Sequence, residues 1–209
     1  MDISFISQER LLNAKLAYTP RNLDLEGVTT LLSGEDVVPR SGDIVLAKVT
    51  KIGHHAGLEL AHGRRSALFV GDEIVVCYGH RYAPDQFEAQ VPPDLGLCDL
   101  VASGGVAARM NLRHANTKAP TSIEPIGLLA NANHQRINLK DTALPKLNSL
   151  FSRPYTVGVV GTSMNAGKTT TAATLIRGLT NAGFKVGAAK VTGTGSGRDT
   201  WLMTDAGSK

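Results

Sequence analysis

The chain has 209 residues, of which 42% are hydrophobic and 19% charged, a balance typical of a globular protein with a buried core. Residues 1–18 mix acidic, basic and apolar side chains, so no secretory signal peptide is expected. No window approaches the roughly 20 consecutive apolar residues that cross a membrane, which argues against a membrane partner. The two cysteines, Cys77 and Cys98, lack the Cys-x-x-Cys spacing of zinc sites. We therefore expect reduced thiols in a cytoplasmic protein.

The formal net charge of +4 is unevenly distributed along the chain. Residues 151–209 carry seven Lys or Arg against two Asp, whereas residues 1–150 carry fifteen Lys or Arg against sixteen Asp or Glu. The positive excess therefore lies in the C-terminal part. Because no aromatic residues are interleaved with these basic residues, the pattern favours nucleotide phosphates over nucleic acid as partner.

The first 150 residues are interpreted as a mainly β accessory or substrate domain. Residues 11–18 and 28–34 suggest one or two short helices. From Gly42 the sequence consists of runs rich in β-branched residues, separated by turns that contain glycine. This pattern predicts a small antiparallel sheet or barrel over residues 42–92. Residues 84–150 contain many Pro, Gly and Asn turn signals and are expected to be rich in loops.

After a linker-like boundary at residues 150–154, the pattern becomes that of an α/β fold. Residues 155–160 form a short apolar run typical of a central parallel strand. The helix expected next has its apolar residues Ala172, Leu175, Ile176 and Leu179 at helical spacing, ends at Gly183, and is followed by a second strand-like run at 184–191. This order predicts a βαβ unit, so residues 151–209 are expected to begin a parallel-sheet, nucleotide-binding domain of the P-loop type.

The segment between the first strand and the helix has the composition of a phosphate-binding loop, the Walker A motif. Gly161 and Gly167 permit the tight curl that turns backbone N–H groups inward, Lys168 supplies an ammonium for phosphate oxygens, and the Thr169 hydroxyl is suited to Mg²⁺. Five residues separate the two glycines where the usual motif has four. A structural alternative is a glycine-rich turn whose Lys-Thr-Thr only begins a helix. The residues predicted to bind nucleotide are Gly161, Thr162, Ser163, Asn165, Ala166, Gly167, Lys168, Thr169 and Thr170.

Residues 155–207 resemble the SIMIBI class of P-loop NTPases, notably the dethiobiotin synthetase and molybdopterin-guanine dinucleotide biosynthesis adaptor families, in which the same five-residue gap occurs. The resemblance covers about a quarter of the chain. It implies that Lys190, at the end of the second strand, acts on phosphate or substrate beside the catalytic Lys168. It also implies that Asp199 is a Mg²⁺ ligand, with Asp205 as the competing candidate. A surface or capping role is the alternative for each of the three.

Two features outside this region invite a functional interpretation. The adjacent His54 and His55 are interpreted as a pair in a turn, because neighbours in a strand point to opposite faces. Residues 78–82 place aromatic, imidazole and guanidinium groups at an expected strand end, where they could contact an anionic substrate or form an ordinary polar loop. The glycine run at 193–197 is interpreted as a switch-like or substrate loop rather than a dinucleotide fingerprint.

The function expected from these observations is Mg²⁺-dependent binding of ATP, with hydrolysis or phosphoryl transfer that activates a small carboxylate-type substrate, as in a hydrolase or ligase. The alternative is an adaptor that binds GTP or ATP and delivers its N-terminal domain to a partner enzyme of cofactor biosynthesis. A homodimer is compatible with either. Since a parallel P-loop sheet needs more strands than residues 155–209 provide, the chain is also expected to be a fragment of a longer protein.

Overall fold

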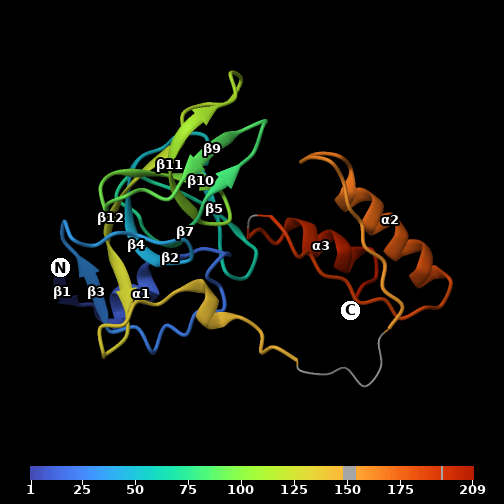
Figure 1. Ribbon diagram of the computed structural model, residues 1–209, viewed down its shortest axis with the longest axis horizontal. Coiled ribbons are helices and arrows are strands. Elements are labelled where there is room, and N and C mark those ends of the chain that lie inside the picture. The colour runs from blue at the N-terminus through green and yellow to red at the C-terminus, as the bar shows by residue number, and fades with distance from the viewer. Residues whose placement is uncertain (148–153, 194) are drawn as a thin grey trace. The chain divides into compact units, whose positions relative to one another are not determined.

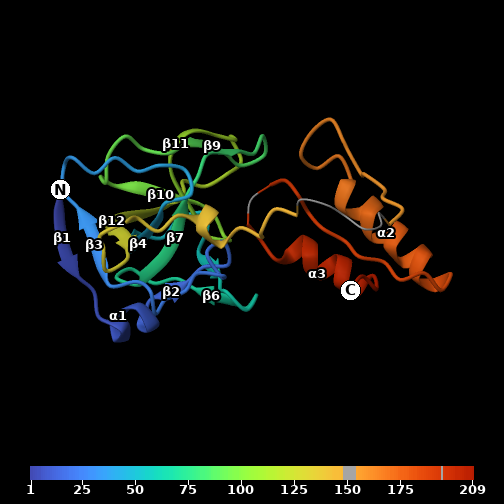
Figure 2. The ribbon, with the colours of Figure 1, turned by 60° about the horizontal axis from the view of Figure 1, so that its bottom comes forward.

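The computed structural model describes residues 1–147, 154–193 and 195–209, which form two compact units (Figures 1 and 2). The first unit comprises residues 1–142 and 194–196, and the second comprises residues 143–193 and 197–209. The linker expected at residues 150–154 lies, apart from Pro154, outside the described residues.

The first unit is built almost entirely of β-strands, with one α-helix and one short 3-10 helix in its described part. Most neighbouring strands are antiparallel, whereas β7 pairs in parallel with both β2 and β11. The helices are α1 (Gln8–Asn13) and the 3-10 helix η1 (Leu139–Thr142). The strands are β1 (Asp2–Phe5), β2 (Lys15–Leu16), β3 (Thr30–Ser33), β4 (Ile44–Lys51), β5 (Gly57–Glu59), β6 (Arg65–Ala67), β7 (Glu73–Tyr78), β8 (Arg81–Tyr82), β9 (Phe87–Gln90), β10 (Cys98–Ala102), β11 (Val106–Arg113) and β12 (Thr121–Ala130).

Five of these strands close into a ring by their pairing. In order, β12 pairs with β4, β4 with β7, β7 with β11, β11 with β10, and β10 returns to β12. Alternate residues of the ring strands belong to a single buried cluster that includes Val45, Val76, Tyr78, Leu100 and Ile123. Because side chains alternate across a strand, we assign this cluster to the inside of the ring.

The opposite faces of the ring strands are also covered. Leu11 of α1 packs with Leu46, Val75 and Leu129, so α1 lies against the outside of β4, β7 and β12, as the views in Figures 1 and 2 agree. A third cluster joins Phe87 of β9 to the outer residues of β10 and β11. Two layers of apolar burial around a closed ring give this unit its core.

The sequence expectations for the first unit need two corrections. The segment 28–34 contains strand β3 instead of a helix, and its buried Leu31 and Leu32 pair with β12. The segment 84–150, expected to be rich in loops, contains β9 to β12, including the ten-residue strand β12.

The parallel α/β sheet predicted for the second unit is wrong. The described residues 155–160 and 184–191 contain no strand, and most of their apolar side chains are exposed, 90% for Val160 and 89% for Val191. Sheets in the described chain belong to the first unit and are largely antiparallel. An apolar run acquires strand structure only when a neighbour satisfies its backbone groups, and none pairs with these runs in the described part.

The helix predicted after the glycine loop is confirmed. Helix α2 (Lys168–Asn181) ends where Gly183 adopts a φ of 88°, and the amide of Phe184 donates to the carbonyl of Leu179 at 3.1 Å. A second helix, α3 (Arg198–Asp205), packs against it. Ala173 and Ile176 of α2 and Met203 of α3 are buried in this small cluster.

Candidate functional site

The glycine loop of the second unit curls tightly before α2 begins. Asn165 has a φ of 62° and Gly167 a φ of 80°, so two nearly adjacent residues adopt the left-handed conformation. Alternation of right- and left-handed residues turns successive backbone N–H groups toward one side, which is the geometry of an anion-binding nest. The loop is exposed from Gly161 to Gly167, so an anion has access to it.

Helix α2 begins directly after the loop. The amide of Thr171 donates to the carbonyl of Gly167 at 2.9 Å and closes the first turn. The preceding amides, those of Lys168 to Thr170, have no intrahelical acceptor, and the N-cap Gly167 has no side chain that could cap them. Together with the helix dipole, these N–H groups favour a negative charge in front of α2.

Lys168 folds back over the loop that precedes it. Its Nζ donates a hydrogen bond to the carbonyl oxygen of Ser163. The side chain passes so close to Gly161 that a Cβ at residue 161 would lie 2.9 Å from Lys168 Cγ. Thus the structure brings the predicted lysine and the predicted loop together, and the lysine has at present a neutral acceptor.

Lys190 and Asp199 form a second cluster of predicted site residues. The Lys190 ammonium pairs with the Asp199 carboxylate, and both side chains are partly buried. Asp199 lies in the first turn of α3, whereas Asp205 is the last residue of that helix. The two aspartates are six residue steps apart, a rise of about 9 Å along the helix, so they are not placed to bind one ion together. Asp205 lines an open groove between α2 and α3 instead, beside Arg177 and Asn181.

The two clusters are not joined in the described structure. Among the hydrogen bonds and ion pairs of the described residues, none connects Lys190 or Asp199 to residues 161–170. Likewise, the part of the chain that is described contains no group of three His, Cys, Asp or Glu able to hold a metal ion. The metal roles of Thr169 and Asp199 remain predictions.

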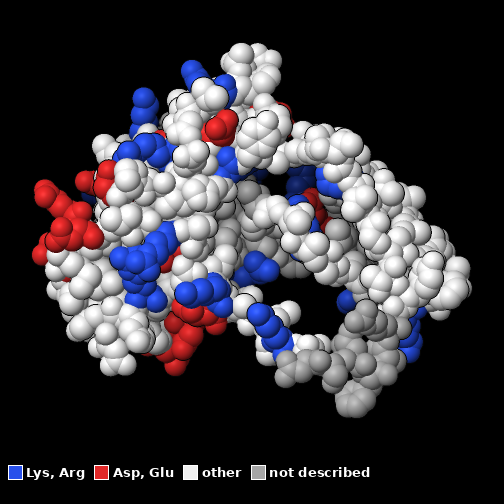
Figure 3. Space-filling view, viewed as in Figure 1, with Lys and Arg blue, Asp and Glu red and all other residues white. Residues whose placement is uncertain are grey.

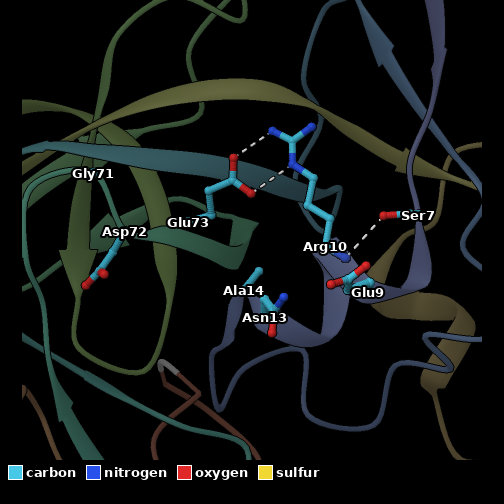
Figure 4. A pocket seen from close by; sticks show the side chains of 8 residues that line it. All are labelled: Ser7, Glu9, Arg10, Asn13, Ala14, Gly71, Asp72 and Glu73. Atoms are coloured by element: carbon cyan, nitrogen blue, oxygen red, sulfur yellow. Dashed lines mark hydrogen bonds and ion pairs between the residues drawn. The ribbon is translucent and has the colours of Figure 1, made fainter.

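The first unit has a groove beside α1, in which three of the four charged lining residues, Arg10, Asp72 and Glu73, form ion pairs (Figure 4). Arg10 forms a bidentate pair with Glu73, with distances of 2.9 and 2.6 Å, and the hydrogen bonds from Arg10 lower the pKa of the Glu73 carboxyl. At the edge of this groove Lys15 lies 2.5 Å from Asp72. Such satisfied pairs suit structural support better than ligand binding.

The two cysteines are buried and free, and burial raises the pKa of each thiol to about 12. They are therefore poor nucleophiles at neutral pH. Figure 3 shows acidic and basic side chains interspersed on the visible face. Within the described residues, no helix is both long enough and apolar enough to cross a membrane.

Comparison of the chain with protein-family models, with curated proteins and with solved structures found no match. Arg81 lies in the segment 78–82 that the sequence analysis singled out, but its grouping with His55 could not be found from sequence, because it depends on contacts between segments far apart in the chain.

Proposed function

We propose that residues 161–170 bind the phosphates of a nucleotide, ATP or GTP, together with Mg²⁺. The observation that carries the proposal is the left-handed curl at Asn165 and Gly167, which ends at a lysine in the first turn of α2. A polyphosphate needs several hydrogen-bond donors close together. This short segment combines the N–H groups of the curl, the N-terminus of a helix and an ammonium. The proposal concerns this local segment and needs no parallel sheet.

The present partner of Lys168 explains how the loop would receive its ligand. The ammonium now bonds to the uncharged carbonyl of Ser163. A phosphate oxygen carries a negative charge, so it attracts the ammonium by a Coulomb interaction that the uncharged carbonyl lacks. Exchange of the Ser163 carbonyl for a phosphate oxygen is therefore favourable, and the lysine needs only to swing away from the loop.

In the proposed complex, a Mg²⁺ ion would be held mainly by phosphate and water. This ion commonly uses one or two protein oxygens in addition to those ligands. Thr169 offers a hydroxyl in the first turn of α2, and Asp199 offers a carboxylate once Lys190 releases it. The ion would neutralise phosphate charge, whereas the loop and Lys168 would orient the phosphates.

The reaction that we propose is hydrolysis, or transfer of the terminal phosphoryl group to a small carboxylate. Support for it comes from the SIMIBI resemblance of residues 155–207 and from the free ammonium that Lys190 would present after separation from Asp199. A positive charge beside the transferred group stabilises the charge that develops on its oxygens.

Isothermal titration of the full chain with MgATP and with MgGTP tests the proposal. Lys168→Ala is expected to weaken binding at least tenfold, which corresponds to about 1.4 kcal/mol. Lys185→Ala, which removes an exposed lysine of the same unit outside the loop, is the matched control and should leave affinity unchanged. Equal affinity of the Lys168→Ala variant and the parent protein would refute the proposal.

A further inference from the structure

In the first unit, two basic side chains share one backbone acceptor. His55 Nε2 lies 3.0 Å from the carbonyl oxygen of Val101, and Arg81 Nη1 donates to the same oxygen. Because a carbonyl only accepts hydrogen bonds, the neutral His55 ring carries its proton on Nε2. Arg81 Nη2 donates to Gln86 Oε1 at 2.6 Å. A guanidinium and an imidazole are thereby fixed side by side at the end of β10.

His54 extends this cluster toward the solvent. Its ring centroid lies 4.8 Å from that of His55 and 5.5 Å from that of Phe87, with edge-to-face geometry in both cases. His55 also contacts Phe87 edge-on, at 5.8 Å. Phe87 is completely buried, whereas the residue His54 is partly exposed. The phenyl ring therefore holds both imidazoles in place while one of them remains accessible.

Arg65 adds a second guanidinium from strand β6. The side chain crosses over Gly57 of β5, where a Cβ would lie 3.2 Å from Arg65 Nε. Burial is the largest cause that lowers the pKa of His55 to about 4, and the charges of His54, Arg81 and Arg65 contribute to the same shift. The shared carbonyl groups Arg81 with His55, the ring contact adds His54, and Arg65 lies over Gly57, two residues from His55. The four basic side chains are called the basic cluster.

The positive charge of the cluster is not neutralised by direct ion pairs. Arg81 has five N–H donors, the two bonds above use neutral acceptors, and its buried Nε has no hydrogen-bond partner. Ion pairs among the described residues include neither Arg65 nor Arg81. The acidic side chains nearby are Asp85, which acts on Arg81 through space, and Glu59, which faces Arg65 across the β5–β6 pair. A partly buried cation without a paired anion is energetically unfavourable.

We propose that Arg81, Arg65 and His54 bind a small oxyanion, either a carboxylate or a phosphate, on the first unit. Three of the five N–H donors of Arg81 are not used in the two bonds above, and a guanidinium can offer paired N–H groups to the two oxygens of such an anion. Arg65 supplies the second charge, and His54 supplies an accessible ring N–H. The site is separate from the glycine loop and requires no nucleotide.

Histidine ring signals in NMR spectra of the full chain provide a local test. The Lys168→Ala background removes the main phosphate donor of the loop, and sodium chloride keeps the ionic strength constant at pH 7.5. Inorganic phosphate and malonate are the two probes. Each is expected to shift the His54 and His55 signals saturably, and the tighter of the two identifies the preferred oxyanion.

Three variants decide between a site and general screening. Arg81→Gln should weaken the saturable binding about tenfold. Arg65→Gln should weaken it too, and since Arg65 is exposed this variant keeps the test valid if Arg81→Gln fails to fold. Arg109→Gln, which removes an exposed arginine paired with Asp94, should leave it unchanged. If neither anion shifts the signals, or if the shifts are the same in Arg65→Gln as in the parent, the proposal is overturned.

Discussion

The ammonium of Lys190 is bound to the carboxylate of Asp199, nine residues further along the chain. Both groups are expected to act on the nucleotide, one on the phosphoryl group and the other on Mg²⁺. While they are paired, neither is free to do so. Under the proposed function, nucleotide and metal together would have to open this pair.

Replacement of Asp199 by Asn should make nucleotide binding less dependent on Mg²⁺. The change removes a proposed metal ligand and releases Lys190, so affinity for metal-free ATP should be unchanged or higher. Titrations with and without Mg²⁺ measure the ratio of the two ATP affinities. Asp205→Asn is the control because Asp205 lies at the other end of α3. If both variants keep the full metal effect, Asp199 is not a ligand.

Two glycines of the second unit should respond in opposite directions to alanine. Gly167 has a φ of 80°, so alanine there should cost about 1–2 kcal/mol of unfolding free energy. Gly178 lies inside α2 with open space around its Cα, and alanine there should contribute about 0.5–1 kcal/mol. Urea unfolding followed by helical circular dichroism gives both values. A stabilised Gly167→Ala variant would contradict the left-handed curl.

The stability of the first unit should rise with pH between about 4 and 6.5. His55 has a folded pKa of about 4 because it is buried, against an unfolded value of about 6.5. In that range the unfolded chain binds more protons than the folded chain, so acidification favours unfolding. The free energy of unfolding should change by up to about 3 kcal/mol across this pH range. The urea midpoints of the parent protein and of His55→Gln should differ less at pH 4.5 than at pH 7.5. An equal difference at the two pH values would contradict the low pKa of His55.

The buried carboxylate of Asp43 should be essential for stability. Its oxygens accept from Arg136 at 3.1 Å, from Asn138 at 2.9 Å and from the Arg40 amide at 2.9 Å. Asp43→Ala leaves the partners of this buried group unsatisfied and should cost about 3–5 kcal/mol.

Asp36→Ala is the matched control for Asp43→Ala, since the Asp36 side chain is 88% exposed and should change stability by less than about 0.5 kcal/mol. Chemical denaturation measures both. Similar values for the two variants would show that the Asp43 network contributes little.

Local features of the fold were accessible from sequence. Helix α2 follows from the spacing of Ala172 and Ile176 and from the stop at Gly183, which all lie within one segment. Strand β12 was missed because it contains Pro125 and Gly127, residues that usually interrupt strands. The structure accommodates both at an irregularity in the β4–β12 register.

Features that depend on distant contacts were not accessible. The run at 155–160 has strand composition, yet whether it forms a strand depends on a neighbour, which composition does not reveal. The tight curl of the glycine loop could be predicted because its residues are contiguous, whereas its phosphate binding stays a prediction. By contrast, Arg81 and His55 meet at the carbonyl of Val101, which lies 20 residues from the former and 46 from the latter.

Backbone amide NMR signals of the full chain during titration with MgATP or MgGTP measure phosphate binding most directly. We predict saturable shifts concentrated at the amides of residues 165–170, where the curl meets α2. A phosphate site in the glycine loop would be contradicted if the amide signals of these residues did not shift. It would also be contradicted if the same shifts appeared in Lys168→Ala.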